Sequence, residues 1–266
     1  MTDSNTQQSI ISVILPTRKR AELLERCITS LMEKADHPSF VEIMVGVDSD
    51  DKETIAFVND TLPELIKKIG CTCKAKLFEP SGYKNLQDVY FNGLISVSKG
   101  EWLFTWCDDG LMESQGWDTK IREFDGTFKF IALKDNHNHP YGLFFCVPRD
   151  WFVLFDLLAP SIHADSWMSI VAIMNGIFER IDVTVFHDRF DLTGNNNDET
   201  FANRDYQEGN PHIEGDFDHV DMKRERMNHA EKINWFLKKI GQTKSPTHFE
   251  LFKAGKLDPF SDIFKK

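Results

Sequence analysis

Two adjacent carboxylates, Asp108 and Asp109, follow a short apolar segment that ends at Trp106. Proteins commonly hold Mg²⁺ or Mn²⁺ with one or two carboxylates while phosphate oxygens of a substrate complete the coordination shell. The pair therefore predicts a site where a divalent cation meets a phosphorylated substrate. The alternative is a solvated turn, because Gly110 follows Asp109 and Asp-Gly is a common turn dipeptide.

A third carboxylate, Asp48, ends the apolar segment VEIMVGV. A carboxylate at a strand end can accept a hydrogen bond from a nucleobase N–H or from a ribose hydroxyl. The alternative is a turn or a helix N-cap within the run Asp48-Ser49-Asp50-Asp51.

Two residues from the second half of the chain extend this set. His187 follows the segment IDVTVF, so its neutral imidazole can complete a metal site begun by Asp109, although most histidines are ordinary surface or core residues. Asp165 opens a predicted helix, where it is either a general base that faces a pocket or a plain N-cap.

Basic residues near predicted helix starts can contact phosphates. The candidates are Lys19, Arg20 and Lys84, although single basic residues on a protein surface are usually only solvated. The segment 188–211 is rich in Asn, Asp and Gly and has no apolar period, so it predicts a long loop. Loops of that length are usually functional or disordered.

The apolar pattern of the first 110 residues places the acidic groups at strand ends. Continuous apolar runs predict buried parallel strands, and apolar residues at helical spacing predict amphipathic helices between them. The predicted strands are 10–15, 41–47, 74–78 and 102–106, and the predicted helices are 18–35, 52–68 and 85–97. This alternation favours right-handed βαβ units in an open, mostly parallel sheet, where ligands bind at the carboxyl ends of the strands.

The alternation of apolar strands and amphipathic helices is less regular beyond residue 116. Strands are predicted at 128–133, 142–147 and 181–186, and helices at 151–158, 165–179 and 218–240, before a tail rich in Phe and Lys. No internal repeat and no linker interrupts the chain, which predicts an α/β domain with a C-terminal helical extension.

Composition narrows the class of protein. The 266 residues are 41% hydrophobic and 27% charged, a balance typical of a folded globular chain. The formal net charge of −11 argues against an extended nucleic-acid or membrane surface, because it repels phosphates and anionic lipids. Five cysteines without structural-zinc spacing predict a cytoplasmic location, and no signal peptide or integral membrane segment is expected.

The ordered set of motifs resembles the GT-A glycosyltransferases, in particular the large inverting family 2. The segment SVILPTRKR at 12–20 matches the family's opening strand, Pro-Thr, basic residue and helix, and NGLISVSKGEW at 92–102 matches its Asn-Gly to Gly-Glu-aromatic stretch. Asp48 resembles the family's base-binding acid, and Cys107-Asp108-Asp109 stands at the Asp-x-Asp position. The sequence departs from the family at Cys107, where the first Asp of that triplet is usual.

This resemblance implies a Rossmann-like GT-A fold with a mostly parallel central sheet flanked by helices. The domain would span 1–215, with a nucleotide-sugar half at 10–120 and an acceptor or catalytic half at 121–215, and a helical extension at 216–266 would pack on it. The implied activity is transfer of a sugar from a nucleotide-diphospho-sugar, most simply UDP-linked, to an acceptor hydroxyl. The implied cofactor is Mn²⁺ or Mg²⁺, and the implied reaction is inverting.

The resemblance also implies roles for individual residues. Asp165 would be the catalytic base, and Asp109 with His187 would hold the metal. The segment 187–200 resembles a family loop that closes over the donor, with Asp198 as a participant. The donor would be bound by Pro16, Thr17, Arg18, Asp48, Lys84 and Asp108, the last of which could instead bind the metal.

Two other classes of protein stay open. Nucleotidyltransferases also use an acidic strand end with Mg²⁺, but they commonly have a glycine-rich basic loop after the first strand, and the segment PTRKR at 16–20 has no glycine. A catalytically inactive nucleotide-sugar or glycan-binding module would keep the pocket without turnover. The sequence does not identify the acceptor, which could be a saccharide, a lipid-linked sugar, a protein or a modified nucleic acid, nor the oligomeric state.

Overall fold

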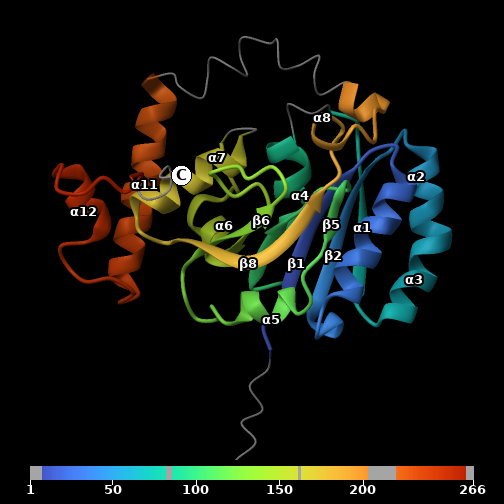
Figure 1. The fold of residues 1–266 in the computed structure, drawn as a ribbon, viewed down its shortest axis with the longest axis horizontal. Coiled ribbons are helices and arrows are strands. Elements are labelled where there is room, and N and C mark those ends of the chain that lie inside the picture. Colours follow the sequence, from blue (N-terminus) through green and yellow to red (C-terminus); the bar gives the residue numbers. More distant parts are fainter. Residues whose placement is uncertain (1–7, 82–85, 161–162, 203–219, 262–266) are drawn as a thin grey trace, which may run out of the picture.

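The computed structural model describes residues 8–81, 86–160, 163–202 and 220–261. Within these ranges, one mixed sheet has the strand order β3-β2-β1-β4-β7-β6-β8-β5, and helices lie against it (Figure 1). The first four strands are β1 (Ile11–Thr17), β2 (Val41–Asp48), β3 (Thr72–Phe78) and β4 (Trp102–Thr105). The remaining four are β5 (Gly110–Met112), β6 (Phe130–Asp135), β7 (Phe145–Pro148) and β8 (Phe178–His187).

The first four strands are parallel, as predicted. β1 pairs with β2 on one side and with β4 on the other, so the strand order reverses beside β1. Such a topological switch point is where open α/β sheets bind ligands. The second half of the sheet is mixed, because β7 pairs antiparallel with β4 and β6, and β5 pairs antiparallel with β8.

β1 separates two hydrophobic cores. Because side chains alternate along a strand, Ile11, Val13 and Leu15 face one core while Ile14 faces the other. The first core contains the apolar face of helix α1 (Ala21–Glu33), and the second contains that of α7 (Ala164–Met174). Burial on both faces explains why β1 is a continuous apolar run.

Helices lie between the strands of the first half of the chain, but their bounds differ from those predicted from the sequence. Helix α1 begins at Ala21 rather than at residue 18, because Lys19 has a left-handed backbone with φ of 53° and Arg20 is not helical. The predicted helix 52–68 is divided into α2 (Lys52–Ala56), a π-helical turn (Phe57–Thr61) and α3 (Leu62–Ile69). The predicted helix 85–97 is a π-helical turn (Leu86–Phe91) followed by α4 (Asn92–Ile95).

The second half contains further departures. The helix predicted at 165–179 is α7 and ends at Met174, because Gly176 has φ of 67° and β8 begins at Phe178. Elements that the pattern did not predict are β5, a 3₁₀ turn (Pro38–Phe40), α5 (Trp117–Arg122), α8 (Phe190–Thr193) and α12 (His248–Lys253). The predicted helix at 151–158 is α6 (Arg149–Phe155).

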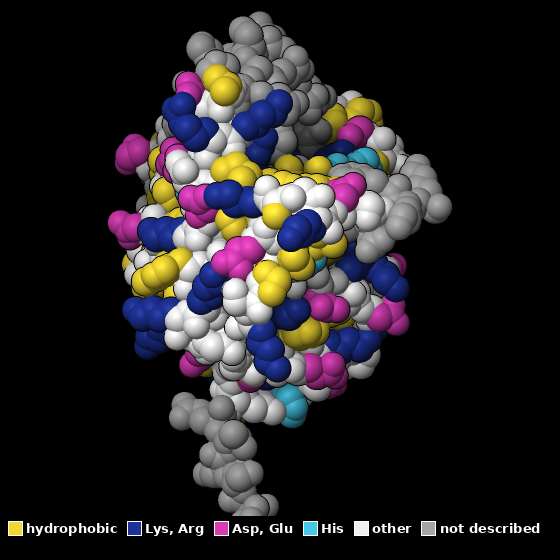
Figure 2. All heavy atoms as spheres, turned by 90° about the vertical axis from the view of Figure 1, so that its left-hand side faces the viewer, with side chains coloured by type: hydrophobic (Ala, Val, Ile, Leu, Met, Phe, Trp, Pro, Cys, Tyr) yellow, Lys and Arg dark blue, Asp and Glu magenta, His cyan; other side chains and the backbone are white. Residues whose placement is uncertain are grey.

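The C-terminal part packs at the far end of the sheet (Figure 1). Helix α11 (Val220–Lys239) contacts α7, where His229 accepts a hydrogen bond from the Trp167 indole at 3.3 Å. The predicted division at 215/216 lies outside the described residues. No helix in the described ranges combines the length and the hydropathy needed to cross a bilayer. On the side that α11 and α12 form, acidic and basic side chains are interspersed (Figure 2).

Candidate functional site

The acidic groups gather at the carboxyl ends of β1, β2 and β4. Thr17, the last residue of β1, donates a hydrogen bond from Oγ1 to Asp108 Oδ2 at 2.7 Å, across the switch point of the sheet. Asp108 and Asp109 are 5% and 6% exposed, so both carboxylates lie largely out of water. Because burial of a charge is costly without partners, their neighbours decide what this site can do.

Asp48 ends β2 and already has a donor on each oxygen. The Arg18 guanidinium lies 2.5 Å from Oδ2, and the Tyr90 hydroxyl donates to Oδ1. Arg18 also binds Asp50 at 2.6 Å. A nucleobase or ribose group that bound Asp48 would have to share the carboxylate with one of these donors or displace it.

Arg20 is the central cation of the site. Its side chain is 8% exposed and lies 2.9 Å from Asp108 and 3.6 Å from Asp109. It also makes a two-point contact with Asp198, through Nε at 2.6 Å and Nη2 at 2.9 Å. Arg20 thereby joins the end of β4 to the segment after α8.

The pKa values follow from burial and these charges. Burial opposes the charged form of Arg20, but the hydrogen bond to Asp198 and the negative charges of Asp108 and Asp109 outweigh it and raise the pKa of Arg20. Burial, opposed by Arg20 and reinforced by the charge of Asp109, raises the pKa of Asp108 to about 6. The Arg20 guanidinium therefore compensates the negative charge of two adjacent buried carboxyl groups.

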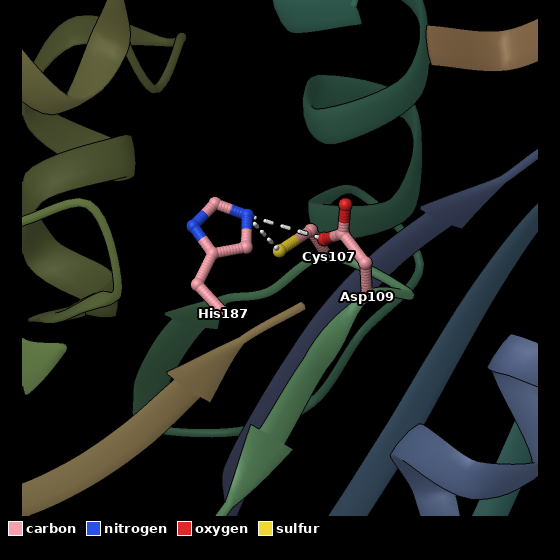
Figure 3. Close-up of side chains that lie close together, drawn as sticks. All are labelled: Cys107, Asp109 and His187. Atoms are coloured by element: carbon pink, nitrogen blue, oxygen red, sulfur yellow. Dashed lines mark hydrogen bonds and ion pairs between the residues drawn. The ribbon is translucent and has the colours of Figure 1, made fainter. Parts of the chain in front are cut away.

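Cys107, Asp109 and His187 point toward one another (Figure 3). His187 Nε2 lies 3.7 Å from Cys107 Sγ and 3.2 Å from Asp109 Oδ1. The second contact is close but lacks hydrogen-bond alignment, so Asp109 Oδ1 is a buried oxygen without a hydrogen-bond partner. A sulfur, a carboxylate oxygen and an imidazole nitrogen that converge on one point, with one oxygen unpaired, fit a divalent cation.

Strand pairing brings His187 to this place. β5 and β8 pair antiparallel with Gly110 opposite His187, and the Asp188 N–H donates to the Asp109 carbonyl at 2.8 Å. The Asn136 side chain holds the His187 backbone on both sides, accepting from its N–H at 2.7 Å and donating to its carbonyl at 3.2 Å. These contacts fix the backbone of His187 beside Asp109.

The segment after β8 folds back over the β1–α1 turn. Buried Asp188 accepts hydrogen bonds from Thr193 and Asn195 and pairs with Arg26 at 2.8 Å, which organises the start of the Asn-rich stretch. Farther along, the Thr200 hydroxyl donates to the Arg18 carbonyl at 2.8 Å. The described part of this predicted loop therefore lies against the site; residues 203–211 are outside the described ranges.

Asp165 is not part of this cluster. It lies in the first turn of α7, within the electrostatic range of His139 from the turn between β6 and β7, and burial raises its pKa. The His139 ring stacks on His137 at 5.5 Å. A carboxylate whose proton affinity is raised is a stronger base. The assignment of Asp165 as the catalytic base stays a prediction.

Of the predicted donor and metal residues, the structure brings together Thr17, Arg18, Asp48, Asp108, Asp109 and His187. Pro16 lies next to them within β1, and Lys84 lies outside the described residues. Sequence reasoning missed three contributions: Arg20 as the buried cation, Tyr90 as a donor to Asp48, and Cys107 as a potential ligand. Cys107 carried a sequence signal, because it replaces an acid in an acidic triplet, and Arg20 was a sequence candidate only as a phosphate contact.

Comparisons with solved structures identify the fold. The mannosyltransferase PcManGT from Pyrobaculum calidifontis, in complex with GDP-Man and Mn²⁺, is 14% identical, and the match covers 94% of this chain and 80% of that chain at a TM-score of 0.57. TarS 1–349 from S. aureus in complex with UDP is 12% identical over 96% of this chain and 90% of that chain, with a TM-score of 0.53.

A third structure, GalNAc-T7 with UDP, GalNAc and Mn²⁺, is 13% identical over 69% of this chain and 44% of that chain, with a TM-score of 0.54. No family model matches the sequence, and no curated protein matches it. The eight-stranded mixed sheet and these matches show that the chain has the α/β GT-A fold, as the sequence predicted.

Proposed function

We propose that this protein is a glycosyltransferase that takes a sugar from a nucleotide-diphospho-sugar, most simply a UDP-linked one, with the help of a divalent cation. The observation that carries the proposal is the position of Asp109 and His187. The unpaired Asp109 Oδ1 and His187 Nε2 face each other at 3.2 Å, at the carboxyl edge of a GT-A sheet. The similar structures hold GDP-Man, UDP and Mn²⁺, which supports the same class of ligands here.

The chain's own residues divide the work in this proposal. Asp109 and His187 hold the cation, which would neutralise the diphosphate leaving group as a Lewis acid. Thr17, Arg18 and Asp48 contact the nucleoside, and Pro16, Lys84 and Asp108 belong to the same donor site. Asp165 accepts the proton of the acceptor hydroxyl, consistent with a single inverting displacement.

The first test is donor binding by thermal shift. UDP, GDP, CDP, ADP and TDP are each added with and without Mn²⁺ or Mg²⁺, because a ligand that binds only the folded chain raises its apparent stability by mass action. We expect a shift for one nucleotide that needs the cation and that disappears in Asp109→Asn. No cation-dependent shift for any nucleotide would count against the proposed donor site.

Turnover separates the enzyme from a binding module. The matching nucleotide-sugar is incubated with the full chain and candidate acceptors, and release of the nucleoside diphosphate is measured against Asp109→Asn. Release of the nucleoside diphosphate together with transfer of the sugar supports a glycosyltransferase. Release of pyrophosphate from a nucleoside triphosphate would instead indicate a nucleotidyltransferase, and donor binding without consumption would indicate an inactive module.

A further inference from the structure

The ligand set at the end of β8 contains a sulfur atom. We propose that Cys107 is a metal ligand together with Asp109 and His187, and that the site prefers a thiophilic divalent ion such as Zn²⁺ or Co²⁺ over Mg²⁺. This inference rests on the proposed function for the role of the ion in donor binding. The expectation from sequence assigned the metal to Asp109 and His187 and named Mn²⁺ or Mg²⁺; this inference adds Cys107 to the ligands and changes the preferred ion.

Two of the three distances between the ligand atoms are compatible with a tetrahedral ion. Zinc lies about 2.3 Å from sulfur and about 2.0 Å from nitrogen or oxygen, so a tetrahedral site separates sulfur from nitrogen by about 3.5 Å and nitrogen from oxygen by about 3.3 Å. The structure has 3.7 Å between Cys107 Sγ and His187 Nε2, and 3.2 Å between His187 Nε2 and Asp109 Oδ1. Octahedral Mg²⁺, with bonds of about 2.1 Å, separates neighbouring ligands by about 3.0 Å and prefers oxygen.

The other acidic oxygens of the site have partners of their own. Asp108 accepts hydrogen bonds from Thr17 on one oxygen and from Arg20 on the other. Asp109 Oδ2 faces Arg20 at 3.6 Å, which leaves Oδ1 toward His187. An ion bound here would have three protein ligands, which would leave a fourth position for a substrate oxygen, as in catalytic zinc sites.

A thiolate ligand would keep the charges at the ion site balanced. Binding of the ion would form a sulfur–metal bond and release the Cys107 S–H proton to solvent. The thiolate and the Asp109 carboxylate then carry two negative charges, which cancel those of the divalent ion. Because Asp108 is matched by Arg20, the buried centre becomes close to neutral, which reduces the cost of burying charge.

Cobalt titration of the full chain tests the ligand directly. A thiolate ligand to Co²⁺ produces a near-ultraviolet charge-transfer band, which oxygen and nitrogen ligands do not. We expect this band in the wild-type chain, its displacement by Zn²⁺, and no displacement by excess Mg²⁺. Cys107→Ser should abolish the band and weaken Zn²⁺ binding at least about tenfold while changing Mg²⁺ binding by less than about twofold.

The matched control is Cys73→Ser. Cys73 lies near the start of β3, close in sequence to Cys71, and is not in the ligand cluster. The Cys73→Ser variant should leave the charge-transfer band unchanged, and this result would exclude Co²⁺ binding at Cys71 and Cys73. Cys107→Asp is a second variant in case Cys107→Ser does not fold, with folding checked by circular dichroism; it should lose the band and bind Mn²⁺ and Mg²⁺ more tightly relative to Zn²⁺.

The outcomes separate this inference from the proposed function. The assignment of Cys107 as a ligand is overturned by any of three results. Co²⁺ does not bind, Co²⁺ binds without the charge-transfer band, or the band persists in Cys107→Ser. If Cys107→Ser then transfers the sugar with Mg²⁺ as well as the wild-type chain does, the proposed function stands without Cys107 as a ligand. If the band depends on Cys107 but no nucleotide-sugar is bound or consumed, the metal site stands and the proposed function fails.

Discussion

Replacing Arg20 by methionine should strongly destabilise the folded chain. Arg20 is 8% exposed and faces Asp108 at 2.9 Å and Asp109 at 3.6 Å, while those two side chains are 6% and 7% exposed. Methionine keeps much of the length of the side chain but leaves two adjacent buried carboxylates without their cation. Breaking a buried ion pair in this way typically costs about 3–5 kcal/mol, because an uncompensated charge stays behind.

The measurement is urea unfolding with EDTA present, so that no metal ion replaces the lost charge. A loss of about 3–5 kcal/mol corresponds to a fall in melting temperature of about 6–20 °C for a chain of this size. The matched control is Lys19→Met in the same turn. Lys19 pairs with Glu199, but their side chains are 41% and 59% exposed, so this loss should stay below about 1 kcal/mol.

A loss of less than about 1 kcal/mol in Arg20→Met, or a loss no larger than in Lys19→Met, would show that Arg20 does not compensate the buried carboxylates. Equal destabilisation by Arg20→Lys and Arg20→Met would also contradict this compensation, because lysine keeps the charge and loses only the two-point contact with Asp198. An added divalent cation should stabilise Arg20→Met more than the wild-type chain, since the cation takes over part of the lost charge.

Three further predictions concern other parts of the chain. Burial opposes the charge of Asp118, but hydrogen bonds from the backbone N–H groups of residues 36 and 37 and from Arg122 lower its pKa. The stabilisation of the folded chain by the Asp118 carboxylate is therefore complete above its unfolded pKa of about 3.9. This stabilisation is lost as the pH falls through the folded pKa. Asp118→Asn should cost about 2–3 kcal/mol at pH 7 in urea unfolding, and the difference from wild type should shrink below about pH 4; a loss that does not depend on pH would contradict this. Gly100→Ala should cost about 1–3 kcal/mol, because a Cβ at Gly100 would lie 2.6 Å from the Ser12 backbone nitrogen; an unchanged midpoint would refute it. Asp165→Asn should lower kcat by about 10²–10⁴ with little change in KM for the donor if Asp165 is the base, and an unchanged kcat would remove it from the mechanism.

The apolar periodicity of the sequence determined most of the first half of the fold. A strand buried on both faces is mostly apolar, so β1, β2 and β4 were visible as runs, and the acids Asp48, Asp108 and Asp109 stood at or just after their ends. Their meeting at one edge follows from parallel pairing alone. Short elements such as β5 were missed, because three residues carry no detectable period.

Tertiary structure alone decided which side chains meet inside the site. Cys107 and His187 are 80 positions apart, and they meet because β8 pairs antiparallel with β5 in a register that places Gly110 opposite His187. Arg20 reads as a surface cation in the sequence, yet the turn before α1 directs it onto carboxylates from two distant segments. Periodicity records which face of an element is buried, whereas register and turn geometry depend on contacts between distant segments and leave no local pattern.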